Sequence, residues 1–210
     1  YLIDQVQLIP KSVSANGTSI KTEIAFNHPV KELVWTVQYD EMKNKCWEAL
    51  TGQEYSIDSC SGCVLKSASA TELCFPNNHF NYGLPSFAEE DDDAIVFAKL
   101  QFNGIDRSVE FDGKYFNSVQ PYQRHTSVPP KGIYVYSFAL KPEESQPTGS
   151  ANFSRIDNAH LCLQLYPINK LVNKITGVSE FTGQVTVNIW AVNVNVLRIM
   201  SGMGGLAYSN

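Results

Sequence analysis

The stretch QPYQRHTSVPPKGIYVYSFALKPEESQPTGSANFSRIDNA, residues 120–159, contains a dense aromatic segment between two long loops. Its centre, residues 133–140, places Ile133 and Val135 on one face and these residues on the other: Tyr134, Tyr136, Phe138 and Leu140. Because both faces are apolar, the pattern predicts a central strand that is covered on both sides. Prolines and glycines on either flank predict loops over 120–131 and 141–157.

The rest of the chain alternates apolar and polar residues with a period of two, which predicts strands. Together with the aromatic strand, these segments give eight strands: 2–9, 20–26, 33–39, 94–102, 107–111, 158–166 and 185–196. Asn-Gly pairs at 16–17 and 103–104 predict hairpin turns. No segment shows an amphipathic helix of ten residues or more. We therefore expect an all-β fold, an eight-stranded antiparallel jelly-roll sandwich with long loop insertions, in a single domain over 1–210.

The last predicted strand changes phase along its length. Val185, Val187 and Ile189 share one face, whereas Val192 and the valines after it have the opposite parity. A β-bulge at Trp190-Ala191 would keep the apolar side of this strand inward. Beyond it, the glycines of residues 202–205 lack the helix and the Lys-Ser/Thr of a phosphate-binding loop, so we expect a flexible or tightly packed tail.

Residues 40–92 differ from the rest because Asp, Lys, Ser, Asn and Gly dominate there. The segment predicts a loop insertion that projects outward, with short strands of its own near 64–65 and 73–75. The acidic run 89–93 lacks the spacing and glycine of a calcium loop, so a solvated loop is the favoured interpretation.

The net charge of −5 and the pI near 5.4 argue against direct binding of nucleic acid. No run of about 18 apolar residues predicts a membrane-spanning helix. Because the chain begins with Tyr1 rather than Met and opens on a strand, we expect it to be part of a longer protein.

Four of the five cysteines fall within the insertion: Cys46, Cys60, Cys63 and Cys74. One Cys-x-x-Cys pair with two further thiolates could bind zinc, but a structural site usually has two such pairs. Zinc and disulfides are given similar weight, and free thiols are favoured over either. Cys162 lies between leucines in a predicted strand, where a small, partly buried residue is expected.

No constellation of catalytic residues is visible, so we expect neither enzymatic activity nor a cofactor. The four histidines are far apart, and His28 and His125 are interpreted as loop residues that form hydrogen bonds. Asn16, on a predicted turn, is the more accessible of two glycosylation sequons; Asn152 begins the other.

Three separated blocks go beyond a generic sandwich: FNHPVKELVW at 26–35, GIYVYSFALKPEESQPTGSANFSRIDNA at 132–159, and NVLRIMSGMGGLAYSN at 195–210. Together they resemble the major capsid proteins of nucleocytoplasmic large DNA viruses, a double jelly-roll family. The resemblance covers most of the chain outside the insertion, and it is confined to the second, C-terminal jelly roll.

This resemblance implies a structural subunit that self-associates into homotrimeric, pseudo-hexagonal capsomers tiling an icosahedral shell. It also implies contacts with neighbouring capsomers and minor capsid proteins, a place in the virion, and assembly in the cytoplasm of the infected cell. The insertion would belong to the outward tower of the capsomer, and no catalytic residue is carried over.

Within this interpretation, the loops around the aromatic strand are expected to orient neighbouring jelly rolls, with Arg155 and Asp157 as candidate assembly residues. The alternative is a lectin-like or receptor-binding jelly-roll module whose loops hold a glycan or receptor. A metal-dependent enzyme of the cupin kind is disfavoured because the histidines are not clustered.

Overall fold

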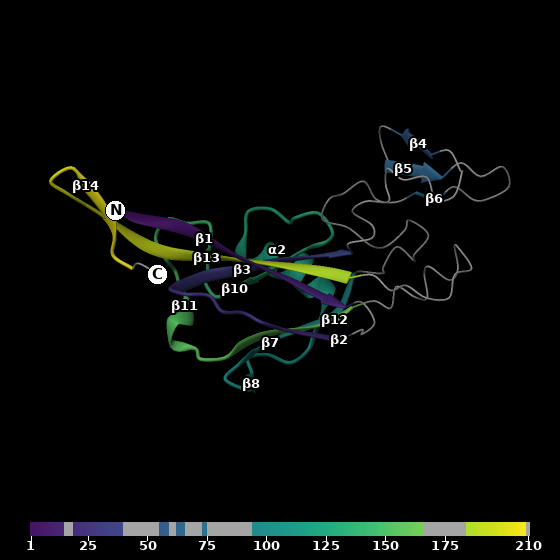
Figure 1. The fold of residues 1–210 in the computed structure, drawn as a ribbon, viewed down its shortest axis with the longest axis horizontal. Helices are drawn as coiled ribbons and strands as arrows, with labels where there is room; N and C mark the ends of the chain where they lie inside the picture. The colour runs from purple at the N-terminus through teal and green to yellow at the C-terminus, as the bar shows by residue number, and fades with distance from the viewer. Residues whose placement is uncertain are drawn as a thin grey trace.

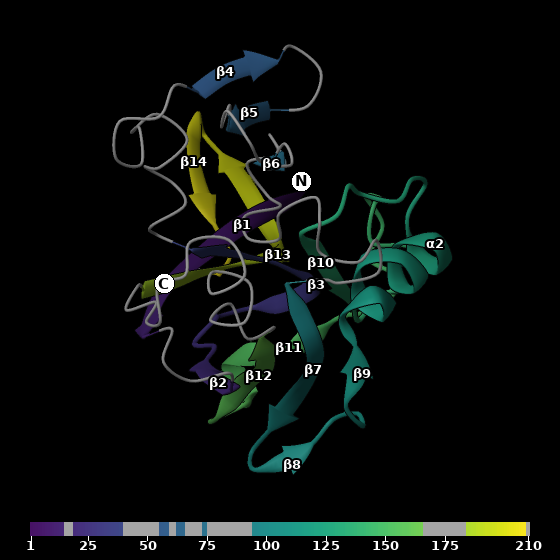
Figure 2. The ribbon, with the colours of Figure 1, turned by 90° about the vertical axis from the view of Figure 1, so that its right-hand side faces the viewer.

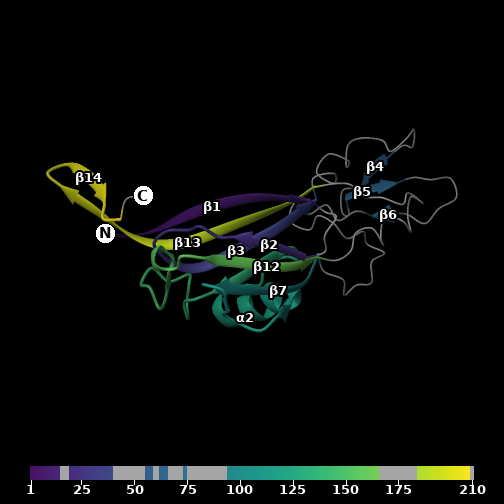
Figure 3. The ribbon, with the colours of Figure 1, turned by 60° about the horizontal axis from the view of Figure 1, so that its bottom comes forward.

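Two antiparallel sheets are stacked face to face in the computed structural model, as Figure 3 shows. The structure describes residues 1–14, 19–39, 94–165 and 184–208, together with the backbone of 55–58, 62–65 and 73–74. One sheet has the order β1 (Leu2–Ser14), β13 (Gln184–Met200), β3 (Pro29–Tyr39), β10 (Ile133–Ser137). The other has the order β2 (Ser19–Glu23), β12 (Ala159–Leu165), β7 (Ile95–Phe102), β8 (Ile105–Asp106). Since β1, β2 and β3 alternate between the sheets, the predicted jelly-roll sandwich is confirmed.

Several short strands extend the predicted set of eight. β11 (Ala151–Asn152) pairs with β3, β14 (Met203–Leu206) with β13, and β9 (Phe111–Asp112) with β7. A separate small sheet contains β4 (Tyr55–Asp58), β5 (Gly62–Leu65) and β6 (Leu73–Cys74), close to the two short strands predicted in the insertion. Figure 1 shows this sheet beyond one end of the sandwich.

The alternation in the sequence correctly identifies the core. On β3, Leu33, Trp35 and Val37 are buried, and the leucines of β12 face them from the other sheet. Trp35 is fully buried, with its ring centroid 5.2 Å from that of Phe116 and 6.2 Å from that of Tyr134. These aromatic contacts join the middle of the sandwich to the segment between β9 and β10.

That connecting segment is helical, contrary to the expectation that no helix of ten residues exists. Residues 113–124 form a continuous helical run that includes η2 (Tyr115–Val119) and α2 (Gln120–Arg124). It buries Phe116, Asn117, Gln120 and Pro121, a spacing that places them on one helical face. The run lies beside β9 and β10, where it closes one side of the sandwich (Figure 2).

The aromatic strand β10 is an edge strand, so the prediction that it is central was wrong. In the described part of the chain β10 pairs with β3 alone, and it ends at Ser137, which leaves Leu140 exposed. The amide groups of Phe138 and Ala139 both donate to the carbonyl oxygen of Lys31, turning the chain away from the sheet. Tyr134 and Val135 are nevertheless both buried, because the helical run and the following loops cover this edge.

The two Asn-Gly predictions have different outcomes. Asn103 and Gly104 have φ angles of 50° and 81° and connect β7 to β8, as predicted. Pairing begins directly after this turn, at Ile105, rather than at the predicted strand 107–111. Residues 15–18 lie outside the described residues, but β1 and β2 belong to different sheets and do not form a hairpin.

The glycines at 202–205 belong to a hairpin. Ser201 and Gly202 have φ angles of 52° and 79° and connect β13 to β14. This hairpin extends past the ends of the other strands (Figure 1), and all four residues of β14 are exposed. Among the described residues, no helix is long and apolar enough to cross a membrane.

Candidate assembly surface

The outer face of the six-stranded sheet carries apolar side chains that nothing in the described chain covers. Leu2, Val6 and Leu8 on β1 are 43%, 65% and 51% exposed. They are paired in register with Val196, Val192 and Trp190 on β13, so both strands present apolar groups to the same side. On the β13–β14 hairpin, the exposed Met200 and Met203 are paired with each other, and Met200 has the parity of Trp190, Val192 and Val196. The exposed Ile199 and Leu206 have the opposite parity and lie on the other side of the hairpin. We call Leu2, Val6 and Leu8, together with Met200 and Met203, the outer apolar face.

A bulge on β3 determines the polar part of this surface. In the pairing of β13 with β3, Val192 lies opposite Glu32, but Asn193 lies opposite Val30, which leaves Lys31 as the extra residue. A bulged residue turns its side chain away from the regular alternation. The predicted bulge at Trp190-Ala191 was therefore misplaced, because β13 keeps its parity and the irregularity belongs to β3.

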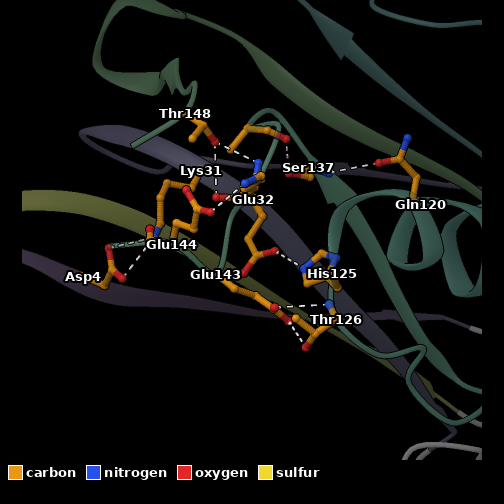
Figure 4. Close-up of polar contacts among 12 residues, drawn as sticks. Asp4, Lys31, Glu32, Gln120, His125, Thr126, Ser137, Glu143, Glu144 and Thr148 are labelled. Carbon is orange, nitrogen blue, oxygen red and sulfur yellow. Dashed lines mark hydrogen bonds and ion pairs between the residues drawn. The ribbon is translucent and has the colours of Figure 1, made fainter. Parts of the chain in front are cut away.

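The bulge directs Lys31 into a partly buried ion pair, in which the lysine is buried and its partner Asp4 is 45% exposed. The Lys31 side chain is 1% exposed, and Nζ lies 3.0 Å from the carboxylate oxygens of Asp4 on β1. Nζ also donates to the carbonyl oxygen of Glu144 at 3.4 Å. As Figure 4 shows, Lys31 thereby connects β1, β3 and the loop that follows β10.

This loop is also held by contacts of its own. Lys141 Nζ lies 2.8 Å from Glu144 Oε1, and the amide of Lys141 donates to Thr148 Oγ1 at 2.8 Å. The surface ion pair is exposed and contributes little by itself. Combined with the two backbone bonds to the Lys31 carbonyl, these contacts give the loop one defined position against the sheet.

A second ion pair holds the loop that follows α2. His125 Nε2 lies 2.6 Å from Glu32 Oε2, and both side chains are mostly buried. Glu143 accepts hydrogen bonds from the amide and hydroxyl of Thr126 nearby (Figure 4). The hydrogen bond to Glu32 raises the pKa of His125; burial opposes this effect, and the charge of Glu143 adds to it. His125 is thus a loop residue that forms a hydrogen bond, as predicted.

We expect the contribution of this pair to stability to depend on pH. Because the folded-state pKa of His125 is raised, the contribution is fully present below its unfolded value, near pH 6.5. It is lost as pH rises through the folded-state pKa. Urea unfolding of wild type and His125→Gln from pH 5.5 to 9 measures the difference, expected to be about 1.5–3 kcal/mol at the acid end. A difference that is independent of pH would contradict this assignment.

Buried amides replace apolar side chains where β13 leaves the core. Asn193 and Asn195 are fully buried and lie on the parity of the core residues Ile189 and Ala191. Asn195 Nδ2 donates to Gln5 Oε1 at 2.9 Å and to the carbonyl oxygen of Tyr208 at 2.8 Å. The amide of Tyr208 donates back to Asn195 Oδ1. This reciprocal pair of hydrogen bonds attaches the chain after β14 to the inward side of β13.

Arg155 and Asp157 lie together at the end of η3 (Phe153–Arg155) and just beyond it. Both are exposed, and within the described residues neither side chain has a hydrogen bond or ion pair. Their position is defined by neighbours: Asn152 Oδ1 accepts from the Ser154 amide, and Ser154 Oγ accepts from the His28 amide. The two candidate residues are thus held by their backbone, with their charged groups pointing into solvent.

Asn16, Cys46 and Cys60 lie outside the described residues, and of Cys63 and Cys74 only the backbones are described, in β5 and β6. Asn152, which begins the other sequon, is described: it is exposed, and its side chain accepts from the Ser154 amide. Cys162 is a free, partly buried thiol on β12, as expected, and burial raises its pKa. In the described ranges, no group of three or more His, Cys, Asp or Glu residues could hold a metal ion.

No structural role was predicted for Lys31 or Glu32, or for Glu143 and Glu144 in the loop after β10. The available signal was the adjacent pair Lys31-Glu32 in a strand whose next residues alternate, since two consecutive charged residues interrupt that pattern. The partners Asp4, His125 and Glu144 are distant in sequence, so the pairing itself could not be read from the chain.

Comparison with known proteins gives a consistent result. The family model described as large eukaryotic DNA virus major capsid protein matches residues 1–205. The major capsid proteins of Paramecium bursaria Chlorella virus 1 and Phaeocystis pouchetii virus are 39% and 38% identical over the whole chain. The chain spans about half of each relative, 48% in both cases.

Solved structures agree with this result. A chain in a quasi-atomic model of the PBCV-1 virus capsid has a TM-score of 0.66 and 37% identity. It covers all of this chain, which in turn covers 51% of that one. The Faustovirus major capsid protein has a TM-score of 0.60 at 12% identity, over 92% of this chain and 33% of that one, and supports the fold alone.

Proposed function

Because the chain belongs to the major capsid protein family of large eukaryotic DNA viruses, we propose that it associates with copies of itself into trimeric, pseudo-hexagonal capsomers. It is a structural component of the virion, and the proposed role is non-enzymatic. We further propose that residues 1–210 are one jelly-roll domain, the second of two in the full protein. Its single complete sandwich and its coverage of half of each relative support this proposal.

The observation that carries self-association is the outer apolar face. Exposed apolar side chains occur singly on most soluble proteins, but here they follow two paired strands and continue onto a projecting hairpin. A contiguous apolar surface of this kind is typical of a protein interface. The ion pairs of Lys31 and His125 hold the neighbouring loops rigid, and a repeating contact requires such rigidity.

The resemblance supports the finer features of the proposal. On that basis we propose contacts with neighbouring capsomers and with minor capsid proteins, and assembly in the cytoplasm of the infected host cell. The Cys-containing insertion would contribute to the outward face of the capsomer.

Charged substitutions on β1 test self-association. We expect Val6→Asp and Leu8→Asp to weaken association of the purified chain by about 100-fold or more, since burying an unpaired carboxylate costs several kcal/mol. Ser12→Asp, on the same face of the same strand and already exposed, is the matched control. Sedimentation equilibrium measures the stoichiometry, and electron cryomicroscopy checks for trimers or lattice patches.

Two outcomes would contradict self-association through β1. Wild-type trimers that Val6→Asp and Leu8→Asp leave intact would show that association does not use β1. A monomeric wild-type chain with saturable glycan binding would instead favour a lectin-like module.

Charge reversal at Arg155 or Asp157 is expected to impair assembly more than folding. Both side chains are exposed and unpaired within the described chain, so Arg155→Glu and Asp157→Arg should change the unfolding free energy by less than about 0.5 kcal/mol. The same sedimentation and urea experiments report both quantities. A variant that assembles like wild type would remove that residue from the interface.

A further inference from the structure

A cavity of about 410 Å³ opens beside the helical run, away from the outer apolar face. Its wall comes from β7, from the segment linking β8 to β9, from the helical run, and from the end of β10 with the loop after it. Aromatic rings form much of it, contributed by Phe102, Phe111, Tyr115, Tyr136 and Phe138. The rings of Phe111 and Tyr115 are stacked with centroids 4.3 Å apart.

The polar groups in this cavity are mainly hydrogen-bond donors. Arg107 and Arg124 both line it, and no aspartate or glutamate does. Within the described residues neither guanidinium has an ion-pair or hydrogen-bond partner, and the buried Nε of Arg124 is unsatisfied. A ligand with two acceptor oxygens matches these unpaired guanidinium groups.

One hydroxyl group adds to these donors. Ser108 also lines the cavity, but its Oγ is buried and has no partner in the described chain. Tyr115 Oη accepts a hydrogen bond from Gln120 Nε2 at 2.8 Å, which leaves its own O–H to donate. The side-chain oxygen of Gln120 is engaged as well, because Oε1 accepts from the Ser137 backbone amide at 3.4 Å.

We propose that this cavity binds a carboxylate on a neighbouring polypeptide, with an adjoining aromatic residue against the ring wall. Arginine is the side chain best matched to the planar, two-oxygen geometry of a carboxylate. The volume exceeds that of a single anion and falls in the range of cavities that enclose small organic groups. The choice of a polypeptide rests on the proposed capsid function, in which protein subunits surround the chain.

Small probes test the proposal on the isolated 210-residue chain. Isothermal titration with N-acetyl-Asp-Phe-amide is expected to give a dissociation constant of about 1 mM or lower. The isosteric N-acetyl-Asn-Phe-amide should bind at least tenfold more weakly. Phenyl phosphate distinguishes a phosphate ligand from a carboxylate ligand.

Substitutions of the two cavity arginines test whether the Asp dipeptide binds in the cavity. Arg107→Gln and Arg124→Gln should each weaken binding of the Asp dipeptide at least tenfold, and the exposed Arg107 can change without disturbing the core. Arg198→Gln, an exposed arginine in the β13–β14 hairpin, is the matched control and should bind like wild type.

Equal binding of the two dipeptides, no binding of either, or wild-type affinity in both cavity variants would overturn the proposal. Tighter binding of phenyl phosphate than of the Asp dipeptide would overturn the choice of a carboxylate. A chain that forms trimers and shows any of these results would refute the cavity's role while leaving the capsid function intact.

Discussion

Replacing Trp35 with alanine is expected to lower the free energy of unfolding by about 3–5 kcal/mol, a large part of the roughly 5–15 kcal/mol by which a folded domain is stable. Trp35 is fully buried on β3, and its ring contacts Tyr134 on the neighbouring strand and Phe116 on the helical run. Alanine would leave a cavity between the six-stranded sheet and the helical run that covers its edge. Urea unfolding followed by circular dichroism measures the loss.

Two further variants test whether the loss of stability comes from buried aromatic packing. Trp35→Phe keeps an aromatic ring and removes an indole N–H that has no hydrogen-bond partner in the described chain, so it should cost clearly less than alanine. Trp190→Ala makes the same deletion on the outer face, where the side chain is only partly buried, and should also cost less. If Trp35→Ala were no more harmful than Trp190→Ala, the aromatic contacts would not hold the sandwich together.

Replacing Gly113 with alanine is expected to cost about 1–3 kcal/mol through overpacking against a backbone that cannot easily move. A Cβ at this position would overlap the carbonyl oxygen of Ile95 and lie 3.1 Å from its carbonyl carbon. Gly113 begins the helical run, so relief of the clash requires this run to move away from β7. Near-ultraviolet circular dichroism should report the disturbed stacking of Phe111 and Tyr115 in addition to the loss of stability.

The control is Gly205→Ala, because a Cβ there meets nothing within 4 Å. This exposed glycine on β14 should tolerate alanine within about 0.5 kcal/mol. Equal stability of the two variants would mean that residues 113–124 do not pack against β7 at the distance seen here.

The two proposed contact sites lie on different sides of the jelly roll. The outer apolar face lies on the β1 side of the six-stranded sheet, whereas the arginine cavity lies beside β10 and the helical run at the other side. The proposed tiling requires each subunit to bind neighbours in two directions, and two sites on opposite sides would meet that requirement.

Much of the fold followed from the period-two alternation. The inward faces of β2, β3 and β12 were correctly predicted because each of these strands buries one face and exposes the other. The helical run was not predicted because Tyr115, Val119 and Tyr122 lie next to its buried residues. The proline at the start of α2 also obscured the pattern, since proline usually interrupts a helix. The spacing of Phe116, Asn117, Gln120 and Pro121 was the available signal.

The candidate site was predicted only in part. Arg155 and Asp157 are both exposed, which is compatible with an assembly role, but nothing in the described chain tests that role. The Lys31 and His125 ion pairs were not predicted, because they join residues 27 and 93 positions apart in the sequence.

From the residues alone, the class of fold, most of the core strands and the membership of a capsid family could be predicted, because these depend on local alternation and on blocks of residues. The edge position of β10, the site of the bulge and the pairing of the charges depend on contacts between residues that are distant in the chain. Residues 133–137 show the difference. Their apolar side chains predicted burial on both faces of the strand. The same apolar surface is removed from water whether strands or a helix and loops cover it. A pattern of hydrophobicity cannot distinguish the two, so the place of β10 at the edge, with the arginine cavity beside it, had to come from the structure.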